Sequence, residues 1–179
     1  NPGTDALFNW LGALHSVKDR VPGPMSEELF GLGEFIALIQ LRNLFHHQAE
    51  VASRVRALSI DGFDLVSDLG ILCLVDRPVV EMALDGIGSK FRDIQRPLAE
   101  SALKWYGSCV NIYPAMFNLM VGIVLLSGRF ELSPNEQAFD RLAGAIEHDR
   151  QSGYPITVSG DIGCRAGDVD QVLARLMEM

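Results

Sequence analysis

A short segment of the chain combines an arginine, an amide and two imidazoles within an otherwise apolar run, Leu41-Arg42-Asn43-Leu44-Phe45-His46-His47-Gln48. On a helix, at roughly 100° per residue, Arg42 and His46 fall about 40° apart, and so do Asn43 and His47. Arginine keeps its positive charge and binds phosphate oxygens bidentately, whereas histidine titrates near neutral pH and can move protons. These residue types suit a site for a phosphate group, although an ordinary polar stripe on a helix would have the same composition.

The pattern around this cluster predicts a helix over residues 26–56. Ser26 can cap its start, and Glu27 and Glu28 place negative charge in the first turn, where it is favourable. Apolar residues recur at helical spacing on both sides of the cluster, at Leu29, Leu32, Ile36, Leu38, Leu41, Phe45, Ala52 and Val55. We therefore expect the cluster to lie well inside a helix rather than in a loop.

Another helix is expected to pack against this one. Thr4 can cap it, Pro22-Gly23-Pro24 ends it, and its apolar residues repeat at Leu7, Trp10, Leu11, Leu14 and Val17. So short a connection favours antiparallel neighbours. The two helices are therefore predicted to share one core, formed by Leu7, Trp10, Leu11, Leu14, Leu38, Leu41 and Phe45.

The rest of the chain also favours helices. Helices are predicted over residues 63–75, from a start near Asp76 and Pro78, and from Pro97 to 106. Pro114 opens a further helix through the apolar stretch 115–126. The last of this group runs from the capping motif Ser133-Pro134-Asn135-Glu136 to Gly153. Residues 154–158 could be extended, and Asp168 can cap a closing helix. The sequence thus predicts an all-α protein, a helical bundle of six to eight helices in a single domain over residues 1–179, in which residues 153–179 form an irregular segment plus a C-terminal helix.

Charge narrows the classes of function. The formal net charge of −8 disfavours loose, nonspecific binding of nucleic acid, but it leaves room for a local basic site. A first basic cluster consists of Arg42, Arg54 and Arg56. A second basic cluster consists of Lys90, Arg92, Arg96 and Lys104. Such clusters are usually solvated faces rather than binding sites.

Composition also bears on the compartment. The three cysteines, at positions 73, 109 and 164, form no CxxC pair and suit a reducing environment. Neither a basic start nor an apolar run typical of a signal peptide follows Asn1, and the most apolar stretch, 115–126, is shorter than the ~20 residues that cross a bilayer. We therefore expect a cytoplasmic protein with no membrane segment, no cofactor and no metal.

The spacing Arg42-Asn43-x-x-x-His47 resembles the signature of HEPN-domain proteins, a family of small α-helical bundles. In that family an arginine, a polar residue and a histidine four to six residues past the arginine share one helix. Residues 7–20 also look like the opening helix of several HEPN proteins, so the resemblance covers roughly residues 1–60.

The resemblance implies a metal-independent endoribonuclease, a toxin or antiviral-defence effector, with a composite site across the cleft of a homodimer. RNA would be the substrate, and an antitoxin or regulatory protein a possible partner. Arg42 would stabilise the phosphate charge, Asn43 would orient a neighbouring group, and His47 or His46 would transfer protons. The family spacing favours His47, whereas helical proximity to Arg42 favours His46.

Other interpretations of the cluster remain open. Some HEPN proteins lack activity and serve as interaction or dimerisation modules. The cluster can also be purely structural, with its cations paired to the acids of residues 61–68. A metal site is a third alternative, because a bundle could bring His15, His46 or His47, and His148 together around zinc.

Overall fold

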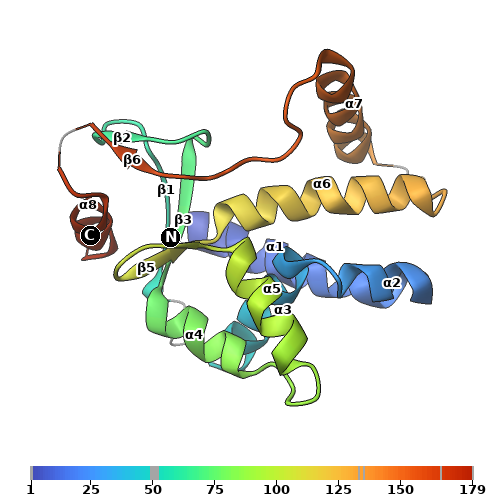
Figure 1. The fold of residues 1–179 in the computed structure, drawn as a ribbon, viewed down its shortest axis with the longest axis horizontal. Coiled ribbons are helices and arrows are strands. Elements are labelled where there is room, and N and C mark those ends of the chain that lie inside the picture. Colours follow the sequence, from blue (N-terminus) through green and yellow to red (C-terminus); the bar gives the residue numbers. More distant parts are fainter. Residues whose placement is uncertain (1, 49–52, 133, 135, 166, 179) are drawn as a thin grey trace.

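The computed structural model describes residues 2–48, 53–132, 134, 136–165 and 167–178, and this part of the chain holds eight helices and two antiparallel sheets (Figure 1). The helices are α1 (Pro2–Arg20), α2 (Gly23–Leu29), α3 (Gly33–His47), α4 (Arg77–Asp85), α5 (Arg92–Ala102), α6 (Tyr113–Arg129), α7 (Gln137–Ser152) and α8 (Val169–Glu178). The strands are β1 (Val55–Ser59), β2 (Leu65–Val66), β3 (Ile71–Asp76), β4 (Lys104–Trp105), β5 (Cys109–Asn111) and β6 (Gly163–Cys164). The all-α prediction is therefore wrong, and the protein is a mixed α/β structure.

The largest departure from the prediction lies between residues 53 and 76. Helices were expected over 26–56 and 63–75, but α3 ends at His47, and β1 pairs antiparallel with β3 so that Val55 lies opposite Val75. Residues 72–75 of β3 are all buried, and the strand therefore shows no alternation of apolar and polar residues. A short apolar run of this kind cannot be told from a segment of buried helix by its periodicity.

Three further expectations are wrong. Helix α5 begins at Arg92 and carries Pro97 in its interior, and it ends before residues 104–105, which form β4 instead of helix. Residues 154–158, expected to be the extended segment, form no strand, and the nearby strand is β6. Helix α1 begins at Pro2, so Thr4 lies within the helix rather than at its cap.

Several helix boundaries are confirmed. Pro114 lies in the first turn of α6, and α7 ends at Ser152, where Gly153 caps it with a left-handed φ of 74°. The Asp168 side chain accepts a hydrogen bond from the backbone N–H of Asp170 at 2.9 Å, as a helix cap does at the start of α8. Ser133 and Asn135 of the predicted capping motif lie outside the described residues.

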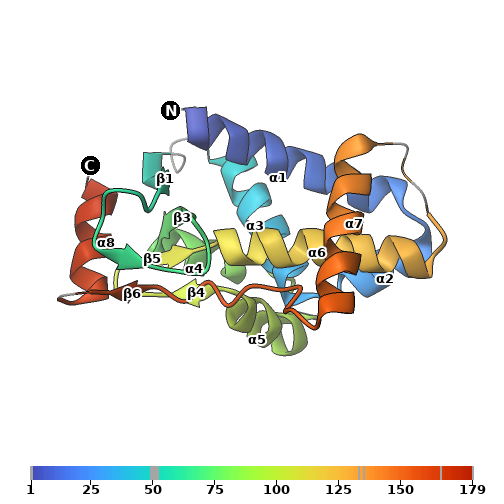
Figure 2. The same cartoon turned by 90° about the horizontal axis from the view of Figure 1, so that it is seen from above.

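The main sheet has the strand order β1-β3-β5-β4 and separates two apolar layers. Cys73, Val75 and Val110 belong to a core cluster shared with α1, α3 and α6. Leu72 and Leu74 belong to a smaller cluster on the other face, shared with α8 and with Ile162. We call residues 154–162 the strap, because they run from the end of α7 back to β6 along α6 and the sheet (Figure 2).

Helix α3 is the centre of the helical layer and contacts α1, α4, α5 and α6. Residues 35–39 are all buried, which places the first half of α3 in the core on every side. The predicted core shared with α1 is confirmed: Leu7, Leu11, Leu14, Leu38, Leu41 and Phe45 are buried in one cluster, and Trp10 packs against it. Phe8 of α1 and Phe45 of α3 meet edge to face with ring centroids 5.1 Å apart.

None of the helices in the described part of the chain combines the length and the apolar character needed to span a membrane.

Candidate functional site

All four predicted site residues lie in about the last two turns of α3, because the helix ends at His47. The sequence predicted that they lie well inside a helix. They lie instead at its C-terminal end. Phe45 faces the core, Arg42 and Asn43 are half-buried, and His46 and His47 are exposed. The cluster is thus anchored on one side and open to solvent on the other.

The side chains of the cluster are arranged in two pairs. The guanidinium Nη1 of Arg42 donates a hydrogen bond to Asn43 Oδ1 at 3.3 Å. The imidazole rings of His46 and His47 meet edge to face with centroids 5.3 Å apart. The carbonyl end of a helix carries partial negative charge, so cationic side chains are favourable here and an anion must be held by those side chains rather than by backbone N–H groups.

Arg42 differs from five other arginines of the protein, which pair with carboxylates, in having no acidic partner among the described residues. Arg54 pairs with Asp76 at 3.2 Å, and Arg129 forms a bidentate pair with Glu28 at 2.6 and 3.0 Å. Those guanidinium groups are already neutralised by carboxylates. Within the described part of the chain, no carboxylate neutralises the positive charge of Arg42 in this way.

Two of the acids that could have made this cluster purely structural, Asp61 and Asp68, form hydrogen bonds with other residues. Asp61 accepts a hydrogen bond from the Ser59 hydroxyl at 2.8 Å. Asp68 accepts hydrogen bonds from the backbone N–H groups of Ser159 at 2.7 Å and Gly160 at 2.9 Å. The structure therefore gives no support to an ion pair between Arg42 and residues 61–68.

The structure does not bring the candidate metal ligands together. His15 lies 3.8 Å from Asp19 on α1, whereas His148 belongs to α7. Among the described residues, no group of three or more His, Cys, Asp or Glu side chains is close enough to hold a metal ion. Nothing in this part of the chain favours the zinc site considered from the sequence.

The other arginines of the first basic cluster lie in a different environment from Arg42. Arg54 and Arg56 precede or belong to β1 and line a hollow of about 490 Å³ between the sheet and α8. Arg54 is paired with Asp76, and Arg56 donates to the backbone carbonyls of Ser53 at 2.9 Å and Val55 at 3.0 Å. The cluster seen in the sequence is therefore not one basic surface, because its helix ends before these residues.

The second basic cluster is occupied by internal contacts. Arg92 donates to the backbone carbonyl of Asp85 at 2.8 Å, and Lys104 pairs with Asp161 at 2.9 Å. Arg96 binds the carboxylates of Asp85 and Glu100, and these hydrogen bonds raise the pKa of its guanidinium. These contacts fit the interpretation of this cluster as a structural, solvated face.

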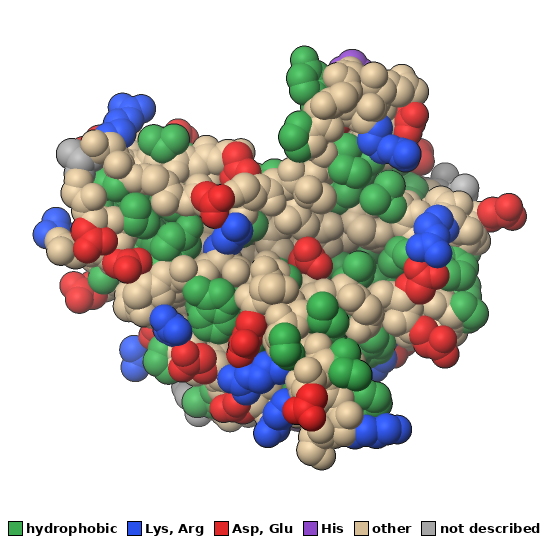
Figure 3. Space-filling model, viewed as in Figure 1, with side chains coloured by type: hydrophobic (Ala, Val, Ile, Leu, Met, Phe, Trp, Pro, Cys, Tyr) green, Lys and Arg blue, Asp and Glu red, His purple; other side chains and the backbone are tan. Residues whose placement is uncertain are grey.

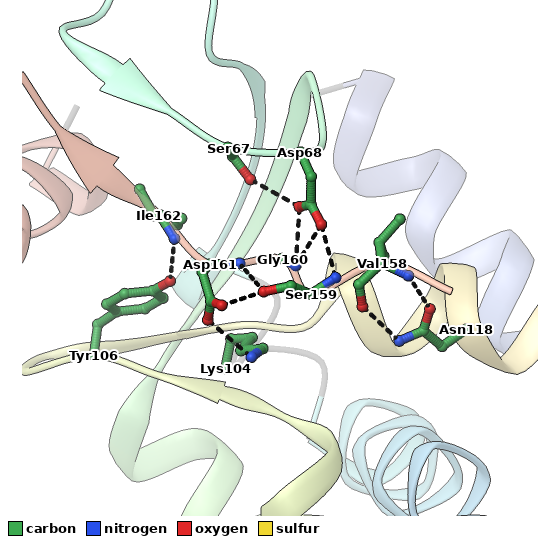
Figure 4. Close-up of polar contacts among 10 residues, drawn as sticks. All are labelled: Ser67, Asp68, Lys104, Tyr106, Asn118, Val158, Ser159, Gly160, Asp161 and Ile162. Atoms are coloured by element: carbon green, nitrogen blue, oxygen red, sulfur yellow. Dashed lines mark hydrogen bonds and ion pairs between the residues drawn. The ribbon is translucent and has the colours of Figure 1, made fainter. Parts of the chain in front are cut away.

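A further densely hydrogen-bonded polar region is the strap, for which the sequence predicted only an extended segment over 154–158 and no site (Figure 4). Asn118 of α6 donates to the carbonyl of Val158 at 3.0 Å and accepts from its N–H at 2.9 Å. Tyr106 accepts from the N–H of Ile162 at 3.0 Å, and burial raises the pKa of its phenol. A signal existed in the sequence, because an amide within the apolar stretch 115–126 requires a hydrogen-bonding partner when it is buried.

Comparisons with protein-family models, with curated proteins and with solved structures gave no match. The chemistry of the site is therefore interpreted from its own residues.

Proposed function

We propose that the C-terminal end of α3 binds the phosphate backbone of RNA and that the protein is a metal-independent endoribonuclease. One observation carries the proposal: the half-buried guanidinium of Arg42 is bonded to Asn43, lacks an acidic partner in the described residues, and is followed by two exposed imidazoles. A fixed cation beside titratable groups is the minimum equipment for cleaving a phosphodiester without metal.

The chemistry proceeds by transfer within the RNA strand. A neutral imidazole removes the proton of a 2′-hydroxyl, and the 2′-oxygen attacks the adjacent phosphorus. The bond from phosphorus to the 5′-oxygen breaks, an imidazolium protonates that leaving oxygen, and a 2′,3′-cyclic phosphate remains. Arg42 stabilises the charge on the phosphorus oxygens, Asn43 keeps the guanidinium in place, and His47 or His46 transfers the protons.

The proposal includes a homodimer, because one arginine and two histidines are few for this reaction and a two-fold axis doubles them. Most of α3 is enclosed by α1, α4, α5 and α6, so only its last turns can approach an axis. The composite cleft would therefore form end to end at His46 and His47. Sedimentation at rising protein concentration measures this step directly, and a protein that stays monomeric rules out the composite site.

RNA would be recognised locally. Acidic and basic side chains are interspersed over the face seen in Figure 3, and the net charge is −8. A site with one uncompensated arginine per chain neutralises few phosphates, so binding should depend only weakly on salt concentration. A toxin or antiviral-defence effector in the cytoplasm, held in check by an antitoxin or regulatory protein, is the biological role that the resemblance to HEPN proteins supports.

The decisive experiment incubates the purified protein with mixed RNA, with and without EDTA, and follows the fragments on a gel. The expected result is cleavage in both conditions, with cyclic phosphate ends. His47→Ala and His46→Ala, made separately, assign the proton transfer: the catalytic histidine is the one whose loss slows cleavage by about 10² or more.

Three results would overturn the proposal. Cleavage that stops in EDTA indicates a metal enzyme. Cleavage that persists in both histidine variants places the activity elsewhere. A dimer that shows no cleavage indicates a noncatalytic interaction module.

A further inference from the structure

An apolar cavity of about 290 Å³ lies on the side of the main sheet that faces α1 and α6. Its walls come from three parts of the fold: α1, the strands β1 and β3, and the first turn of α6. The lining residues are Ala6, Leu7, Trp10, Ala57, Ile71, Cys73, Tyr113 and Met116. Cys73 and Leu7 are buried, whereas Ile71 is 44% exposed, so the cavity reaches from the core to the surface.

The lining of the cavity disfavours a charged ligand. None of its residues carries an ionisable group that is charged at neutral pH, and burying an uncompensated charge there would be strongly unfavourable. Trp10, Tyr113 and Cys73 supply the lining's polar side-chain atoms. Apolar cavities take up apolar molecules, and an enclosed engineered cavity of about 150 Å³ accepts benzene.

From this shape and chemistry we infer that the cavity is a binding site for a small uncharged aromatic molecule. The volume is about twice that of a benzene site and lies near the lower end of the range for ligand pockets. Trp10 and Tyr113 offer flat aromatic surfaces to such a ligand. The site is separate from Arg42 and the two histidines, which are not among its lining residues.

Trp10 makes the inference directly measurable. The chain has two tryptophans, and the other, Trp105, lies in β4 beneath the guanidinium of Arg77 at 5.5 Å. Trp105→Phe therefore leaves Trp10 as the single indole fluorophore. Bromobenzene is a suitable probe, because it is apolar and uncharged and its heavy atom quenches tryptophan emission on contact. We expect bromobenzene to quench the Trp10 emission of this variant to saturation. Benzene, which lacks the heavy atom, should restore the emission by competing for the site.

Ala57→Leu tests the location of the binding site. Ala57 is a half-buried residue of β1 in the lining, and three added carbons at this position occupy part of the cavity. In the Trp105→Phe background, Ala57→Leu should weaken probe binding at least about tenfold. Ala145→Leu adds the same group on the exposed surface of α7 and should leave binding unchanged.

The parent measurement alone can overturn the inference, even if Ala57→Leu does not fold. Quenching that rises linearly without saturation shows collision from solvent and no site. Equal affinity in a folded Ala57→Leu protein, verified by circular dichroism, places the probe elsewhere. Ala57→Val is the milder variant if the leucine disturbs the sheet.

Discussion

The end of α3 and the strap are both rich in polar groups, but they use them in opposite ways. In the strap, backbone groups of four consecutive residues, 158–161, are bonded to side chains of Asn118, Asp68 and Ser159. At the end of α3, Arg42 donates to its neighbour Asn43, and His46 and His47 are exposed. The polar groups of the strap join distant parts of the chain, whereas the described contacts at the end of α3 are between neighbouring residues.

The contrast shows why counts of polar residues are a poor guide to function. An internal hydrogen bond contributes only about 1 kcal/mol net, but an unmade one in a buried place costs more. Polar side chains in contact with a loop are therefore committed to the fold. The residues worth testing for function are those whose charge has no partner inside the protein, as with Arg42 among the described residues.

The largest effect on stability is expected from Gly160→Ala in the strap. Gly160 has a φ of +69°, and a Cβ added there would lie 2.0 Å from Cγ of Pro114. Backbone strain and the clash together should lower the free energy of unfolding by about 3 kcal/mol or more. Urea denaturation measures the loss.

Gly153→Ala is the matched control for that variant. Gly153 has a similar φ of +74°, but a Cβ there would meet no atom within 4 Å. Only the left-handed conformation is penalised, at about 1 to 2 kcal/mol. Equal losses for the two variants would show that the contact between the strap and Pro114 does not hold the strap in place.

The largest effect on activity is expected from Arg42→Ala at the end of α3. Loss of the guanidinium should slow RNA cleavage by at least about 10², or about 2.7 kcal/mol in the activation barrier. The free energy of unfolding should change by no more than about 1 kcal/mol, because only one part-buried hydrogen bond, to Asn43, is removed. Arg42→Lys should also fail, since a point charge lacks the planar fork.

Arg54→Ala controls for the general loss of positive charge. Arg54 belongs to the same basic cluster in the sequence but is paired with Asp76 at 3.2 Å. Its removal should leave the cleavage rate close to that of the parent protein. If both alanine variants slow cleavage equally, the availability of the guanidinium is not what distinguishes Arg42.

A smaller loss of stability is expected from Asn118→Ala. The substitution removes two hydrogen bonds to Val158, at 3.0 and 2.9 Å, and leaves a part-buried N–H and carbonyl without these partners. We expect a loss of about 2 kcal/mol in urea denaturation with RNA cleavage retained. Gln151→Ala removes an exposed amide bonded to Glu147 and should cost no more than about 0.5 kcal/mol. Equal costs would contradict the structural role assigned to the strap.

The smallest effect is a pH dependence at Asp161. Hydrogen bonds from the hydroxyl of Ser159 and from Lys104 lower the pKa of this carboxyl below its ordinary value of 3.8. The ionised form is favoured in the folded state, so the stabilisation is complete above that ordinary value and is lost as the pH falls through the lowered pKa.

Asp161→Asn should therefore be less stable than the parent protein at about pH 6, and the difference should shrink as the pH falls below the ordinary pKa of 3.8. Urea denaturation midpoints for the two proteins, measured above and below that pKa, test this. A difference that does not change with pH would mean that the carboxylate charge of Asp161 contributes nothing to holding the strap.

Local signals in the sequence were sufficient to predict several helices and the core shared by two of them. Helical periodicity gave the pairing of α1 with α3, including Leu11 and Leu41 in one core. Pro114 and Asp168 marked the starts of α6 and α8 correctly, because a proline in the first turn and a capping carboxylate act within a few residues of themselves. Residue types and their spacing likewise identified Arg42 and its neighbours as a chemically unusual segment.

Only the tertiary structure determined the strand pairing, the course of the strap and the contacts of Arg42. Strand β3 is identified by hydrogen bonds to β1 and β5, and Asn118 meets Val158 across 40 residues of chain, so neither contact leaves a periodic signal. The availability of Arg42 depends on where every acid of the folded chain lies, and the cavity beside Trp10 depends on three elements meeting. Residue types and their spacing set the chemistry that is possible, and long-range packing determines which of those groups remain open to a ligand.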